Sequence, residues 1–230
     1  MTAGLLAGGS STFAQSTAKV SGSVIDQVGG LLPYVTVALT HRRSQAHYET
    51  RTDQIGHFEI EGLAAGEYLV DVQLTAFAPV EDRVTLSTGE HLQQNITLQL
   101  GAWEERIVVT DADPPPVAES GTAARDLGRA DTCERSAIGG DVRPPVRLHE
   151  IRPTYPRHLR SAAIQGAVVV AGRIGSDGRL QDSRVLTAAH PDLAAAAVAA
   201  IAEWQWSIPR LDCVPVDGHV TVTVEFKIAP

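Results

Sequence analysis

The sequence predicts an all-β sandwich of about seven strands followed by a small α+β domain, in which two helices pack on a three-stranded antiparallel sheet. Short alternating apolar runs bounded by turn residues fill residues 18–110. This pattern stops over residues 111–142, an acidic stretch rich in Ala, Gly and Pro that is expected to be a flexible linker. Residues 143–230 then give signals in the order helix, strand, turn, strand, helix and strand.

The predicted sandwich consists of apolar runs that recur roughly every ten residues. Turn signals around Gly56 and Gly66 separate neighbouring runs, and both glycines permit tight turns. Phe58 and Tyr68 are expected to fill the sandwich core. The runs cover residues 20–24, 35–39, 58–60, 68–72, 84–86 and 96–100.

The α+β part opens with a short helix and a hairpin. A helix is expected at residues 157–163, because Pro156 is favoured at a helix start. The Asp-Gly pair at 177–178 favours a turn between strands at residues 166–174 and 180–186.

A second helix is predicted from Pro191 onward, followed by the last strand. Trp206 lies just beyond this helix, and both it and Trp204 are expected in the core rather than on a ligand platform. Residues 220–228 alternate strictly, which predicts a strand with one buried face. The apolar stripe of the helix consists of Leu193, Ala197, Ile201 and Trp204.

Composition excludes several classes of partner. The chain of 230 residues has a formal net charge of -8, which argues against nucleic acid because phosphate binding needs surplus cations. No apolar run reaches the roughly 18 residues that a membrane-spanning helix needs. Residues 143–230 are mildly basic, so steering toward acidic protein segments is compatible with this part.

The sequence contains no enzyme motif. His149-Glu150 begins like the HExxH motif of zinc proteases, but Pro153 takes the place of the second ligand. The eight histidines have no ligand spacing, and neither a GxSxG elbow nor a phosphate loop is present. We therefore expect a protein that is not an enzyme, with no catalytic residues, no metal and no cofactor.

Two cysteines, Cys133 and Cys213, lie at the end of the linker and before the last strand. If they form a disulfide, the crosslink restricts the unfolded chain by roughly 4.5 kcal/mol on the loop-entropy model. A structural disulfide is the favoured hypothesis, and a reactive thiol is the alternative.

Residues 1–16 resemble the end of a signal peptide, with small residues at Thr12 and Ala14 before a cleavage site at Gln15. No Lys or Arg lies in this stretch, so a disordered tail is the alternative. Export to the periplasm would favour the disulfide. An inner-membrane anchor encoded upstream of residue 1 also stays open.

The first part resembles the carboxypeptidase regulatory-like domain, a transthyretin-like β-sandwich, over residues 18–110. The family usually has glycine where this chain has Ala76, which puts that one turn in doubt. The resemblance implies an accessory domain without peptidase activity. The motifs that carry it are Val20-x-Gly22-x-Val24-x-Asp26, Thr52-Asp53-x-x-Gly56-x-Phe58 and Gly62-Leu63-x-x-Gly66-x-Tyr68.

The second part resembles the C-terminal domain of TonB over residues 143–228. The motifs that carry the resemblance are Pro153-x-Tyr155-Pro156, Gly166-x-Val168, Asp177-Gly178-Arg179-Leu180, Trp204-x-Trp206 and the closing Val-x-Val-x-Phe. Domains of this family capture the TonB box, an extended segment of an outer-membrane receptor. The resemblance implies that the box adds to the last strand, because an edge strand offers unpaired main-chain groups. The partner-binding residues would be Val220, Thr221, Val222, Thr223, Val224, Glu225 and Phe226, with Arg152, Pro153, Tyr155 and Pro156 nearby.

The predicted function is periplasmic protein–protein contact in TonB-dependent transport across the outer membrane. In the alternative, the sandwich binds envelope carbohydrate or peptidoglycan, and the TonB-like part is structural or dimerising. As another alternative, the last strand could pair with a second copy of itself and form a homodimer.

Overall fold

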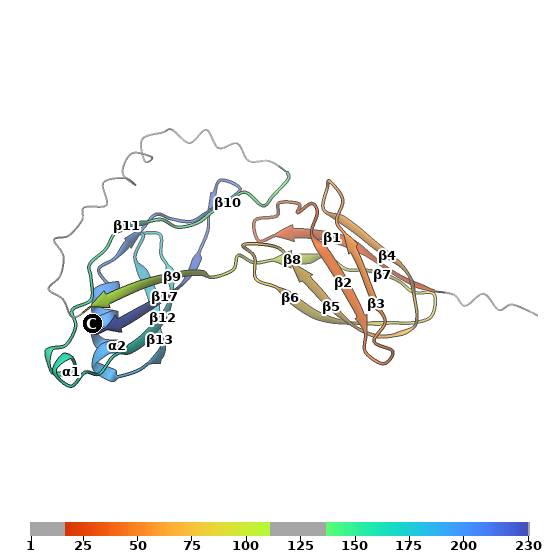
Figure 1. Cartoon of the computed structure of the whole chain (residues 1–230). Coiled ribbons are helices and arrows are strands. Elements are labelled where there is room, and N and C mark those ends of the chain that lie inside the picture. Colours follow the sequence, from red (N-terminus) through yellow and green to blue (C-terminus); the bar gives the residue numbers. More distant parts are fainter. Residues whose placement is uncertain (1–16, 111–136, 230) are drawn as a thin grey trace, which may run out of the picture.

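The computed structural model describes residues 17–110 and 137–229, which form two β-rich parts (Figure 1). Within these residues there are two helices, both in the C-terminal part, and the sheets stay open. The architecture agrees with the predicted order of a β-sandwich followed by a small α+β part. Residues 1–16, 111–136 and 230 lie outside the described residues.

Eight strands of the N-terminal part form two sheets. They are β1 (Ala18–Asp26), β2 (Thr36–His41), β3 (His47–Arg51), β4 (His57–Leu63), β5 (Gly66–Gln73), β6 (Val80–Leu86), β7 (His91–Gln93) and β8 (Ile96–Leu98). One sheet has the antiparallel order β3-β2-β5-β6. In the other, β1 pairs antiparallel with β4 and parallel with β7 and β8.

Alternating apolar residues of the two sheets form the first hydrophobic core. Phe58 and Tyr68 are buried in it, as predicted, and the Tyr68 hydroxyl donates a hydrogen bond of 2.9 Å to a main-chain carbonyl. Gly56 has φ +73°, a conformation that glycine adopts without steric cost. Ala76 has φ +72°, so the turn at this position keeps the left-handed backbone without the glycine that favours it.

The C-terminal part is built on one four-stranded sheet. Its elements are β9 (Trp103–Thr110), α1 (Arg157–Ser161), β12 (Gly166–Ile174), β13 (Leu180–Ala188), α2 (Pro191–Ile201) and β17 (Gly218–Lys227). Short paired segments surround it: β10 (Val142–Arg143), β11 (Arg147–His149), β14 (Gln205–Trp206), β15 (Arg210–Leu211) and β16 (Val214–Pro215). The sheet order is β13-β12-β17-β9.

A second core lies on one face of this sheet. The predicted stripe of α2 is buried there together with both tryptophans, which confirms their assignment to the core. The indole N–H of Trp204 donates to the carbonyl of Ile151 at 2.7 Å. At the start of α2, the Nδ1 atom of His190 accepts a hydrogen bond from the backbone N–H of Asp192 at 3.1 Å.

The expectation of a three-stranded antiparallel sheet is wrong, because β9 adds a fourth strand in parallel orientation. Figure 1 shows β9 lying beside β17, although β9 follows the sandwich strands in the sequence. Residues 103–110 lie at the end of the range assigned to the sandwich, after the last predicted run, and their sequence contains no signal for a partner strand. Parallel pairing involves no local turn, and these two strands are more than a hundred residues apart.

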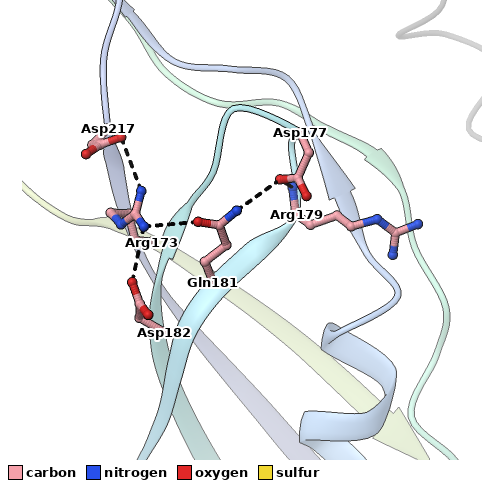
Figure 2. A network of polar contacts seen from close by, with 6 residues as sticks. All are labelled: Arg173, Asp177, Arg179, Gln181, Asp182 and Asp217. Atoms are coloured by element: carbon pink, nitrogen blue, oxygen red, sulfur yellow. Dashed lines mark hydrogen bonds and ion pairs between the residues drawn. The ribbon is translucent and has the colours of Figure 1, made fainter.

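The hairpin of β12 and β13 is closed by residues 175–179, where the Asp-Gly pair predicted a turn. Figure 2 shows the polar network that surrounds this turn. Asp177 accepts from the backbone N–H of Arg179 at 3.0 Å, and Arg173 donates to the side-chain oxygen of Gln181 at 3.0 Å. Arg173 also contacts Asp217 at 3.4 Å, which ties the hairpin to the residue just before β17.

The two parts meet at a packed interface. Leu211 of β15 is fully buried in the core of the sandwich. Leu31 of the sandwich forms a parallel bridge with Ile138, so residues from the end of the predicted linker contact the N-terminal part. Asp26 and Asp212 face each other across this interface, and both are buried.

Candidate strand-binding site

The predicted recognition residues all lie on β17, and their side chains alternate between two faces of the sheet. Val220, Val222, Val224 and Phe226 are buried in the second core. Thr221, Thr223 and Glu225 lie on the opposite, more exposed face. The buried side chains hold the strand in place and are not available as surface contacts, so any recognition through β17 must use its main chain and one open edge.

The expectation that β17 is an edge strand is wrong, because it lies between β12 and β9. The β12 pairing is antiparallel, from Ile174 opposite Gly218 to Gly166 opposite Phe226. The β9 pairing is parallel and in continuous register, from Trp103 opposite Val220 to Thr110 opposite Lys227. Both edges of β17, including the one that the alternative homodimer would have used, are therefore paired within this chain.

The Pro-x-Tyr-Pro segment reaches β17 through one residue. Tyr155 is buried, and its ring meets that of Phe226 edge to face at a centroid distance of 5.4 Å. The Tyr155 hydroxyl donates to the carbonyl of Ile164 at 2.8 Å. Pro153 is also buried and Pro156 half-buried, while Arg152 is exposed. The segment thus supports the C-terminal end of β17.

Glu105 of β9 is the main site residue that the sequence analysis missed. Its side chain points toward the core side of the sheet and is only 21% exposed. One carboxylate oxygen accepts from the indole N–H of Trp206 at 2.9 Å, and the other accepts from the guanidinium of Arg147 at 3.0 Å. The signal in the sequence was the alternation of residues 103–109, in which a glutamate occupies an inward position.

Arg147 is held in position from several sides. It lies opposite Trp206 in the β11–β14 pair, and its guanidinium sits 4.8 Å from the ring centroid of Trp204. Its second terminal nitrogen contacts Glu150 at 3.3 Å. Because stacking and pairing orient the guanidinium, Arg147 and Trp206 present two fixed donors to the carboxylate of Glu105. We call these two donor residues the carboxylate pocket.

A second charged contact joins β9 and β17 on the other face of the sheet. Glu225 forms ion pairs with Lys227 at 2.6 Å and with Arg106 of β9 at 3.2 Å. The hydrogen bond from Lys227, with smaller help from Arg106, lowers the pKa of Glu225 below its ordinary range. The Arg106 side chain is 70% exposed, so solvent screens this contact and it contributes little to stability.

The predicted disulfide can be followed at one end. Cys213 lies between β15 and β16 with φ +69°, and no cysteine is free within residues 17–110 and 137–229. Cys133 lies outside the described residues, so the pairing stays a prediction. We expect Cys133→Ala to lower the melting temperature under oxidising conditions only, because the crosslink acts mainly on the unfolded chain. Melting curves with and without reductant measure this, and an equal loss in reductant would contradict it.

No three His, Cys, Asp or Glu side chains converge within the described part of the chain in a way that could hold a metal ion. Of the two helices that the structure describes, neither is long and apolar enough to cross a membrane.

Two family models match the chain, one after the other. Residues 19–99 match the carboxypeptidase regulatory-like domain. Residues 151–228 match the C-terminal domain of the Gram-negative bacterial TonB protein. Both matches confirm the resemblances found in the motifs, and β9 lies between the two matched ranges.

Other comparisons give only distant likenesses. No curated protein sequence matches the chain. Solved structures that align include catechol 1,2-dioxygenases from Acinetobacter sp. ADP1 and Pseudomonas arvilla C-1, at 9% and 11% identity and a TM-score of 0.32. Each alignment covers 39% of this chain and 54% of the dioxygenase, so this chain spans about half the length of those proteins. A dioxygenase domain from Streptomyces sp. SirexAA-E aligns at 11% identity and the same TM-score, over 40% of this chain and 85% of that one.

Proposed function

We propose that this chain, a carboxypeptidase regulatory-like domain followed by a TonB C-terminal domain, is a contact protein of the bacterial cell envelope. In this proposal, the TonB-like part works in the periplasm and captures an extended segment of an outer-membrane receptor. The segment adds to β17 as a parallel strand, in support of energy-coupled transport across the outer membrane. The proposed role is binding between proteins and involves no enzymatic step.

The observation that carries the proposal is the pairing of β17 with β9. A segment from outside the matched TonB-like region is added to the last strand, in parallel and over eight residue pairs. Main-chain hydrogen bonds supply the affinity in strand addition, and they can be made by any extended segment. The pairing therefore supports the view that this side of β17 accepts an added strand.

The core behind β17 also supports this role. Burial of inward apolar side chains stabilises an added strand, because strand pairing without an apolar face is marginal in water. Here Val109 of β9 is buried against the same cluster that contains Phe226 and Tyr155. The Pro-x-Tyr-Pro segment thereby helps to form the surface on which an incoming strand would lie.

A peptide titration tests the proposal. A synthetic peptide that carries the TonB box of an outer-membrane receptor is added to the 15N-labelled full chain and to its Val109→Asp variant, in which β9 is weakened. We expect saturable shifts of the β17 amide signals, and a peptide of the same composition in scrambled order should produce none. If the box peptide binds to neither protein in the millimolar range, the proposed receptor role is wrong.

A further inference from the structure

We propose that β17 and the carboxylate pocket form a sequence-selective strand site whose resting occupant is β9 of the same chain. The partner that this site takes is a parallel strand with a carboxylate at the position of Glu105 and apolar residues two and four positions later. That partner has to displace β9. The inference rests on the proposed function, to which it adds the sequence pattern of the captured segment and the competition for the site.

The carboxylate pocket is what makes the site selective. Main-chain pairing with β17 does not distinguish sequences, but the two donors at the pocket do. Both oxygens of Glu105 are engaged, by Trp206 at 2.9 Å and by Arg147 at 3.0 Å, and Trp206 is only 1% exposed. A strand with an apolar residue at this position would leave a buried indole N–H without its acceptor and would remove the closer of the two carboxylates that contact the guanidinium of Arg147.

The apolar requirement follows from the register of β9. Ile107 lies opposite Val224 and Val109 opposite Phe226, so both point to the core side of the sheet. Val109 is 7% exposed, whereas its neighbour Val108 is 46% exposed on the opposite face. The site therefore selects the side chains at alternate positions of the bound strand, and the side chains at the intervening positions are free to vary.

Because β9 belongs to the same chain as β17, it competes for the strand site more effectively than a free strand does. The interface around Leu211 and Leu31 places the end of the sandwich next to the TonB-like part, so β9 is held beside β17. A tethered segment has an effective concentration on the order of millimolar, and a free strand must compete with it. The apparent affinity of the intact chain for a partner strand is reduced by this competition.

The experiment uses a fluorescent peptide with the sequence of residues 103–110 as its probe. It is titrated into the full wild-type chain and into two full-chain variants, Val109→Asp and Thr110→Asp. Val109 is buried and Thr110 is exposed, so the same new charge should release β9 only at position 109. We expect the Val109→Asp chain to bind the probe about tenfold or more tightly than the other two. Equal binding by all three chains would show that β9 is not a competing occupant.

The role of the carboxylate pocket is tested with a second peptide and a second variant. A peptide with the Glu105→Gln change should bind the Val109→Asp chain about tenfold or more weakly, because glutamine cannot satisfy both donors as an anion does. Adding Arg147→Gln to that chain should remove most of this difference between the peptides. Equal affinity of both peptides for the Val109→Asp chain would overturn the selectivity.

A full chain with Glu105→Gln provides a variant in which every apolar side chain of the second core is unchanged. We expect it to bind the wild-type peptide more tightly than the wild-type chain does, and the indole signal of Trp206 should shift when its carboxylate acceptor is replaced by a neutral amide. The outcomes also separate this inference from the proposed function. If the peptide of residues 103–110 binds but the TonB-box peptide does not, the strand site stands and the receptor role fails. If both bind but the Glu105→Gln peptide binds equally well, the receptor role stands and the selectivity fails.

Discussion

Replacing Trp204 by alanine is expected to lower the free energy of unfolding of the C-terminal part by about 3–5 kcal/mol, because it removes a fully buried aromatic side chain. Three contacts disappear together. They are the packing in the second core, the hydrogen bond to the carbonyl of Ile151, and the ring on which Arg147 lies. Urea denaturation followed by circular dichroism measures the loss, and two-dimensional NMR shows which part unfolds.

The matched control is Trp204→Phe. Phenylalanine retains a buried ring but not the indole N–H, so we expect a smaller loss of about 1–3 kcal/mol. The sandwich signals should stay unchanged in both variants, since Trp204 belongs to the second core. A loss below about 1 kcal/mol for Trp204→Ala would mean that the tryptophan is not the anchor of that core.

The second large effect concerns pH and arises at the interface between the two parts. Asp26 and Asp212 are 1% and 4% exposed. Their Oδ2 atoms lie near each other, because each is 2.6 Å from the position that a Cβ atom would take at Gly30. Neither Oδ2 atom has another hydrogen-bond partner in the described residues, so the two can bond only when one carries a proton. Burial, and then the hydrogen bond with Asp26, raises the pKa of Asp212 from 3.8 to about 6.

The raised pKa of Asp212 means that the Asp26–Asp212 pair stabilises the folded chain more at acidic than at neutral pH. Between about pH 4 and pH 6 the folded state holds a proton that the unfolded state has already lost. The contribution is complete below the unfolded pKa and is lost as the pH rises through the folded value. We expect the loss to amount to about 2–3 kcal/mol, measured as unfolding free energy against pH.

Asp212→Asn removes this titration. The amide can accept the backbone N–H of Asp141, as the carboxylate does at 2.9 Å, and can donate to Asp26 at every pH. We expect the variant to be more stable than the wild type above pH 7 by about 1–3 kcal/mol, and its stability to vary less between pH 4 and pH 6.

The control for Asp212→Asn is Asp182→Asn, because both positions have left-handed backbones, with φ +48° and +52°. Asparagine tolerates this conformation well, so the control isolates the backbone effect of the substitution. Asp182 is an exposed partner of Arg173, and its replacement should change stability by no more than about 0.5 kcal/mol. If the two variants behave alike, the effect at position 212 does not come from the carboxyl pair.

The local elements of both parts could be predicted from the sequence, because their signals lie within a few residues of one another. The alternation around Phe58 and Tyr68 identified strands and their buried faces. The Asp-Gly pair at 177–178 marked the β12–β13 hairpin, and Pro191 marked the start of α2. Such patterns define which side chains are buried, since period and burial are linked directly in strands and helices.

The carboxylate pocket could not be predicted in the same way. Glu105, Arg147 and Trp206 come from three segments that are far apart in the sequence. Trp206 belongs to the Trp204-x-Trp206 motif, but Glu105 and Arg147 belong to no motif, and both lie outside the two matched family ranges. An inward glutamate in an alternating strand is the one local sign, and it indicates a polar partner without identifying it.

The sequence by itself determined the kinds of domain present, their order, and the strand on which recognition was expected to depend. Only the tertiary structure decided what lies next to that strand. A run such as residues 103–110 has the same alternation whether it joins the sandwich or the second sheet, because side-chain period does not specify a pairing partner. The choice of β17 depends on contacts made across the folded chain, and these contacts turned the expected free edge into an occupied one.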